Sequence, residues 1–106
     1  MQIDAAAKVF AELGNSTRLE ILRLLIKAGP EGLPIGEIQE ALEIPASTLA
    51  FHLRGAVGAG LVAQEKQGRT VLCRPRFDRL NEAIAFLKEE CCVGVRRPAA
   101  RQRRVA

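Results

Sequence analysis

The sequence predicts one mostly α-helical domain with a small β-hairpin, and three observations support this prediction. Apolar residues recur at helical spacing over most of the first sixty positions. Two short stretches follow that are typical of paired strands, joined at Gln67-Gly68-Arg69. A last helical stripe then runs to the cysteines near the end of the chain. The expected order over residues 1–92 is four helices, two strands and a final helix.

The first two helices are predicted over residues 2–13 and from about 16 to 28. Asn15 or Ser16 can cap the second helix, because their side-chain oxygens accept hydrogen bonds from free backbone N–H groups. Gly29-Pro30 ends that helix.

The next two helices are predicted over residues 34–43 and 46–59, with Pro34 in the first turn of the former. Ile44-Pro45 forms a tight connection, since the residue before a proline disfavours helix. Gly60 suits the left-handed stop after the second of these helices. Two helices joined this closely are typical of a helix-turn-helix.

Strands are predicted over residues 61–66 and 70–75, and a last helix over 77–92. The whole order is that of a winged helix-turn-helix, with the hairpin as the wing. Residues 93–106 are rich in arginine and offer little to bury, so we expect a disordered tail that either adds nonspecific phosphate contacts or only solubilises the chain.

The helix over residues 46–59 is predicted to present one apolar side and one mixed side. The apolar side comprises Leu49, Leu53, Ala56, Val57 and Gly60. Opposite them lie Ser47, Phe51, Arg54 and Gly58, with Thr48 on the flank. In a DNA major groove, Arg54 can pair with guanine, Ser47 and Thr48 with several base edges, and Phe51 with a thymine methyl group. The alternative is that Phe51 packs on the preceding helix.

Charge is distributed unevenly along the chain, which carries a formal net charge of +4. Residues 1–45 have a net charge of −3, whereas residues 46–80 hold six basic and two acidic residues. Lys66 and Arg69 are expected at the tip of the wing, where they can reach phosphates or the minor groove. A charged, solvated hairpin end is the alternative. His52, the single histidine, is interpreted as structural.

Several functional classes are disfavoured by the same sequence. No apolar run is long enough to cross a membrane, and the first ten residues lack the layout of a signal peptide, so a cytoplasmic protein is expected. One histidine, without a nucleophile-base constellation or a glycine-rich phosphate loop, argues against an enzyme. A thiol-carrying metallochaperone would leave the mixed helix face and the basic wing unexplained.

Four stretches together resemble the ArsR/SmtB family of bacterial repressors over about residues 5–92. They are Leu13-Gly-Asn-Ser-Thr-Arg-Leu-Glu-Ile-Leu22, Ser47-Thr-Leu-Ala-Phe-His-Leu53, Ala59-Gly-Leu-Val62 and Gly68-Arg69. The resemblance implies a homodimer on a palindromic operator, released when an inducer binds. It also implies a dimer interface made by the first and last helices. The apolar stripe of the last helix agrees, because it needs a partner. The expected interface residues are Phe10, Leu80, Ala83, Ile84 and Leu87.

The chain departs from the family at its familiar metal sites. The stretch 33–39 has no cysteine, and the last helix has no histidine. What remains is Cys91-Cys92, which resembles the arsenic-responsive subset with a C-terminal cysteine pair, and Cys73 on the second strand. Thiolates are soft ligands for thiophilic centres. The expected inducer is therefore arsenite, antimonite or a trivalent methylated arsenical such as methylarsenite, and DNA binding needs no cofactor.

Helix geometry restricts how Cys91 and Cys92 can bind one centre, and the three cysteines have alternative roles. Adjacent residues of a regular helix point about 100° apart, so chelation by both thiols requires the last turn to unwind, helped by the helix stop at Gly94. Cys73 is either a third ligand from the other subunit or a buried strand residue. The pair itself has three alternative roles: two small apolar residues, a redox- or sulfur-responsive switch, or a feature of a repressor without a metal inducer.

Overall fold

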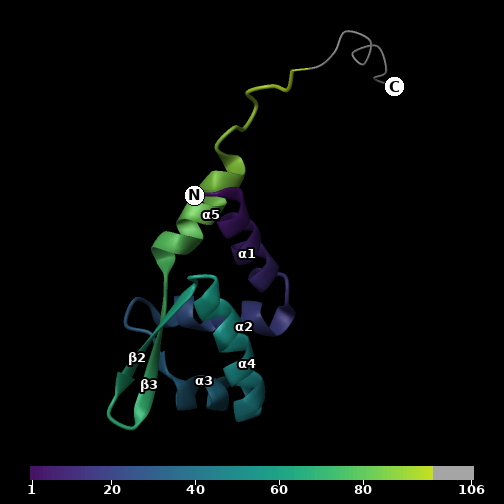
Figure 1. Ribbon diagram of the computed structural model, residues 1–106. Coiled ribbons are helices and arrows are strands. Elements are labelled where there is room, and N and C mark those ends of the chain that lie inside the picture. Colours follow the sequence, from purple (N-terminus) through teal and green to yellow (C-terminus); the bar gives the residue numbers. More distant parts are fainter. Residues whose placement is uncertain (97–106) are drawn as a thin grey trace.

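The computed structural model describes residues 1–96, which form five helices and a three-stranded antiparallel sheet whose β2–β3 hairpin projects at one edge of the molecule (Figure 1). The elements are α1 (Ile3–Leu13), α2 (Ser16–Ala28), β1 (Leu33–Pro34), α3 (Ile35–Leu42), α4 (Ala46–Gly58), β2 (Val62–Gln67), β3 (Thr70–Pro75) and α5 (Phe77–Lys88). The predicted winged helix-turn-helix order is confirmed. The sheet order is β1-β3-β2, so the hairpin is extended by one short strand.

Strand β1 corrects the prediction of a helix from residue 34. Leu33 pairs with Cys73 and Pro34 with Leu72. Pro34 has an extended backbone, with φ −61° and ψ 148°, and precedes α3 as its N-cap. Local sequence could not indicate a two-residue strand, because only its partner β3, far along the chain, defines it.

Helix α5 ends at Lys88 instead of running to residue 92. Residues 89–92 form turns, in which the Cys91 N–H donates to the Lys88 carbonyl at 2.9 Å. Cys92 adopts a left-handed backbone with φ 65°. Every residue from 89 to 96 is exposed, so no other element among the described residues packs on this segment to hold it in a helix. Residues 93–96 of the predicted tail have no helix or strand, and residues 97–106 lie outside the described part of the chain.

The core lies between the sheet and all five helices, with Val9 contributed by α1 and Ala83 by α5. Its largest fully buried side chains are Val9, Ile21, Leu25, Ile38, Leu49, Leu53, Leu61 and Cys73. The predicted apolar side of α4 is correct for Leu49, Leu53 and Ala56, whereas Val57 is 38% exposed. Val57 lies at the margin of the apolar stripe, where α4 turns towards solvent.

The elements separate into two ends of the molecule. Helices α1 and α5 lie side by side at one end, and α3, α4 and the wing lie at the other (Figure 1). Ala6, Val9 and Ala83 are buried in the α1 and α5 region. The side chain of Asn15 caps α2 by accepting from the Arg18 N–H at 3.1 Å, as predicted. No helix within residues 1–96 combines the length and the apolar character needed to cross a membrane.

Candidate functional site

The mixed side of α4 is open to solvent. Ser47, Phe51 and Arg54 are exposed, and Thr48 is half-buried. Phe51 is 58% exposed, and its ring meets that of its neighbour His52 edge to face at 5.3 Å. This exposure contradicts the alternative in which Phe51 packs on α3. An apolar ring beside an exposed arginine suits contact with a base edge.

The six basic residues between positions 46 and 80 fall into two groups. Three have a polar partner within the protomer. Arg74 forms an ion pair with Glu65 at 3.2 Å, and Arg76 forms one with Asp78 at 3.0 Å. Arg79 donates a hydrogen bond to the Ala59 carbonyl at 3.3 Å. The other three, Arg54, Lys66 and Arg69, have no acidic partner within 4 Å among residues 1–96. These three basic side chains are the same three for which the sequence predicted contacts with DNA.

The two wing cations differ in position. Arg69 lies in the turn between β2 and β3, as predicted, whereas Lys66 lies within β2 opposite Val71. Both are exposed, so both remain available to phosphates.

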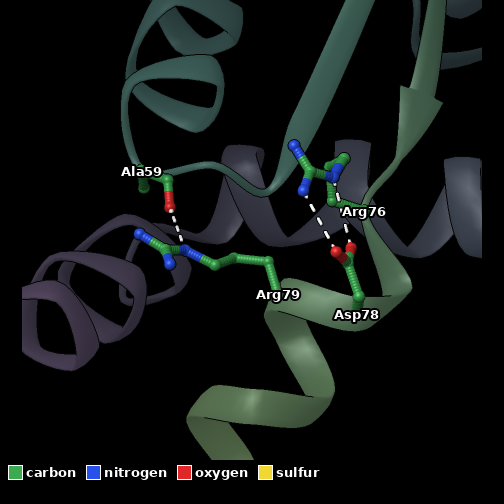
Figure 2. Close-up of polar contacts among 4 residues, drawn as sticks. All are labelled: Ala59, Arg76, Asp78 and Arg79. Atoms are coloured by element: carbon green, nitrogen blue, oxygen red, sulfur yellow. Dashed lines mark hydrogen bonds and ion pairs between the residues drawn. The ribbon is translucent and has the colours of Figure 1, made fainter. Parts of the chain in front are cut away.

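The C-terminal end of α4 is fixed to the first turn of α5 (Figure 2). The Arg79 Nε–H donates to the Ala59 carbonyl, and the Arg76 N–H donates to the Leu61 carbonyl at 2.8 Å. Gly60 lies between these two contacts with φ 79°, and a Cβ there would lie 2.9 Å from Arg79 Nε. Position 60 therefore requires glycine both for its backbone conformation and for the approach of Arg79. The junction sets the angle between the helix that presents the mixed face and the helix that leads to Cys91 and Cys92.

A second contact fixes α4 against α1. The Arg18 Nε–H donates to the Glu12 carbonyl at 2.9 Å and lies 3.0 Å from Glu12 Oε2. The Glu12 carboxylate lies against Gly55 of α4, where a Cβ would clash with it. His52 is half-buried near this contact, and its buried Nδ1 has no partner among the described residues. These contacts give Glu12, Arg18 and Gly55 a positioning role that local sequence did not reveal.

The predicted dimer residues do not all face outwards. Ala83 is fully buried in the protomer's own core, so its side chain offers no exposed surface to a partner. Phe10 and Leu80 are partly buried against that core. Ile84 and Leu87 are 45% and 70% exposed, and Ile3 of α1, which the sequence did not single out, is 66% exposed. The α5 stripe is wide enough for its inner edge to pack on α1 while its outer edge stays uncovered.

The three cysteines occupy two different environments. Cys91 and Cys92 are exposed, and their Sγ atoms lie 3.2 Å apart. Cys73 is fully buried in β3, where Gln64 Nε2 donates to its Sγ at 3.7 Å. Burial raises the pKa of the Cys73 thiol, and the Gln64 hydrogen bond only partly offsets this. Within residues 1–96, no group of three or more His, Cys, Asp or Glu side chains is arranged to hold a metal ion.

A helix-turn-helix with free cations on its exposed helix and on its wing defines a DNA-binding module. The chain matches a helix-turn-helix domain family over residues 13–65. It is 33% identical over 86 residues to the HTH-type transcriptional regulator MJ1325 of Methanocaldococcus jannaschii, covering 81% of this chain and 94% of that protein.

Solved structures give the same result. An ArsR-like transcriptional regulator from Rhodococcus is 30% identical, with a TM-score of 0.72 over 81% of this chain and 78% of the other. A homodimeric winged helix-turn-helix DNA-binding domain from Mycobacterium bovis is 26% identical, with a TM-score of 0.66 over 83% and 82%. The chain belongs to the helix-turn-helix transcriptional regulators, in the ArsR-like winged-helix group. It is therefore a DNA-binding regulator and not an enzyme.

Proposed function

We propose that this chain is a dimeric repressor that leaves its operator when a trivalent arsenical or antimonite binds Cys91 and Cys92. The observation that carries the proposal is the 3.2 Å separation of two exposed thiols at the end of α5. At that separation both sulfurs can ligate one centre. The unwinding expected of a regular helix is not needed, because the chain leaves the helix at Lys88.

The chemistry requires only thiols and the inducer. Methylarsenite carries two hydroxyl groups and one methyl group on trivalent arsenic. Each thiol forms a sulfur–arsenic bond and gives up its proton, and each displaced hydroxyl leaves with that proton as water. The methyl group remains the third substituent, so two thiols complete the site. Cys73 is buried within the sheet, so we assign it to the core and not to the ligand set.

The dimer is proposed from the uncovered apolar face of α1 and α5. Ile3, Ile84 and Leu87 expose most or nearly half of their surface there. Exposed apolar side chains gathered on one face are typical of an interface. The relative from Mycobacterium bovis is described as a homodimer, and a two-fold dimer matches a palindromic operator. A ligand at the end of α5 would then act beside the interface and, through the α4–α5 junction, on the recognition helix.

Fluorescence anisotropy of a labelled upstream-promoter duplex tests the proposal. The reduced full chain is titrated with methylarsenite, arsenite, antimonite, zinc and cadmium. Release by a trivalent metalloid is expected for the wild type and for Cys73→Ser, and no release for Cys91→Ser/Cys92→Ser. Cys73→Ser is the matched control, since it removes a thiol outside the pair.

Two results would overturn the inducer assignment. DNA binding that ignores every metalloid would leave the pair without a sensory role. Release by an oxidant, reversed by a dithiol and absent in Cys91→Ser/Cys92→Ser, would instead favour the redox alternative. There the two thiols form a disulfide and pass two electrons and two protons to the oxidant.

A further inference from the structure

An open groove lies between the exposed side of α4 and the neighbouring side of α1. Its lining residues are Lys8, Glu12, Arg18, Phe51, Arg54, Gly55 and Gly58. Its volume is about 420 Å³, far above the roughly 10–15 Å³ that a cavity needs to hold one water. The groove can therefore accept a segment of another molecule. It continues the recognition face, since Phe51 and Arg54 belong to both.

Lys8 is a free cation facing this groove. Glu12 lies four residues later on α1, the spacing at which a carboxylate normally pairs with a lysine. Here the Glu12 carboxylate is turned towards Arg18 Nε, 3.0 Å away, and against Gly55. Among residues 1–96, no acidic side chain lies within 4 Å of the Lys8 ammonium. The groove thus carries Lys8 and Arg54 as unpaired charges, whereas Arg18 and Glu12 neutralise each other.

Gly58 is the last residue of α4, and its side of the helix is open to solvent. Gly55 is explained by the Glu12 carboxylate, but a Cβ at Gly58 would meet nothing within 4 Å. Glycine inside a helix destabilises it relative to alanine. A glycine at an open helical position is consistent with close approach by a partner outside the protomer.

We infer that the groove between α1 and α4 receives the sugar-phosphate backbone of DNA, with Lys8 contacting a phosphate and Gly58 permitting the approach. A helix with its side chains is about 10–12 Å across, and the major groove is about 12 Å wide. When α4 occupies that groove, a phosphate backbone runs along each of its sides. The Lys8 groove lies along one of these sides. A lysine there supplies a point charge to a phosphate, which fixes the register of α4 without reading sequence.

This inference concerns DNA binding alone, so its test uses the reduced protein without any metalloid. The probes are an operator duplex and a scrambled duplex of the same length, measured over a range of salt concentrations. For Lys8→Ala, affinity falls by the same factor on both duplexes. The slope of log K against log salt falls by about 1 for each lysine removed. Lys27→Ala is the matched control, because Lys27 is an exposed lysine of α2 outside the groove. For Lys27→Ala, the slope of log K against log salt stays at the wild-type value.

Gly58→Ala separates a DNA contact from a folding effect. The new methyl group meets open space in the protomer. The melting temperature of the variant therefore equals or exceeds that of the wild type. DNA affinity nonetheless falls, because the new methyl group narrows the groove. Wild-type affinity and salt slope in both Lys8→Ala and Gly58→Ala would overturn the inference. So would a change in dimer dissociation without a change in the salt slope, since the groove would then be covered by a second copy of the chain.

Discussion

Helices α4 and α5 each leave one side uncovered by the rest of the protomer, and the two sides differ in chemistry. The open side of α4 carries Ser47, Phe51 and the free cation Arg54. The open side of α5 carries Ile84 and Leu87. A polar face with an unpaired cation suits a polyanion, whereas an apolar face suits a lasting protein partner. The two amphipathic helices therefore suit different kinds of partner, and the difference lies in the side chains that the core leaves exposed.

The largest expected effect follows from placing a charge on the apolar face. Leu87→Glu should yield a monomer, because a carboxylate would be buried at the proposed interface. Operator affinity should fall by about 10²-fold or more, since two linked half-site contacts become independent. Sedimentation velocity and anisotropy measure the two effects. Leu19→Glu is the control, because Leu19 is also exposed but lies on α2. A Leu87→Glu dimer with normal affinity would show that this face is not the interface.

Removing the free cation of α4 tests the other side of the comparison. Arg54→Ala should weaken operator binding by about 1–3 kcal/mol and relax base preference at one position of each half-site. Binding to a panel of single-base operator variants measures both effects. Arg23→Ala removes an exposed arginine of α2 and should leave the panel unchanged. If Arg54→Ala weakened all duplexes equally, Arg54 would contact phosphate and not a base.

The junction between the two helices should have a smaller effect. Arg79→Met keeps the aliphatic length but removes the hydrogen bond to the Ala59 carbonyl (Figure 2). We expect the free energy of unfolding to fall by about 0.5–1.5 kcal/mol, measured by urea denaturation. Arg79→Lys retains a hydrogen-bond donor, so its free energy of unfolding should fall by less. Equal stability of all three proteins would show that the contact does not fix α4 to α5.

The smallest effect is expected from Asp78. The Arg76 hydrogen bond lowers the pKa of this carboxyl below its usual value. A depressed pKa in the folded state means that the ion pair stabilises the fold above the unfolded-state pKa and is lost as pH falls through the folded-state pKa. Asp78→Asn should therefore flatten the acid limb of the stability curve slightly, as followed by thermal melts. Both side chains of the pair are exposed, so a steep change would indicate a further acid-sensitive contact.

Sequence patterns predicted most of the fold but not its closest contacts. The cap at Asn15, the left-handed Gly60, the open face of α4 and the buried strand position of Cys73 all follow from local rules. Strand β1 and the inward position of Ala83 do not, because each depends on a partner element distant in the sequence. Lys8 carried no local signal either. It becomes a site residue only because Glu12 pairs with Arg18 instead.

The sequence by itself determined the order of helices and strands, the mixed face of α4 and the existence of an adjacent cysteine pair. These depend on periodicity, capping and composition, which act over a few residues. Tertiary structure decided which cations stay free, which part of the α5 stripe remains uncovered and where α5 ends. These features depend on ion pairing and burial between elements that are far apart in the sequence. The end of α5 shows this directly, since the helical pattern continues to Cys91 but no part of residues 1–96 packs on residues 89–96 to hold the helix.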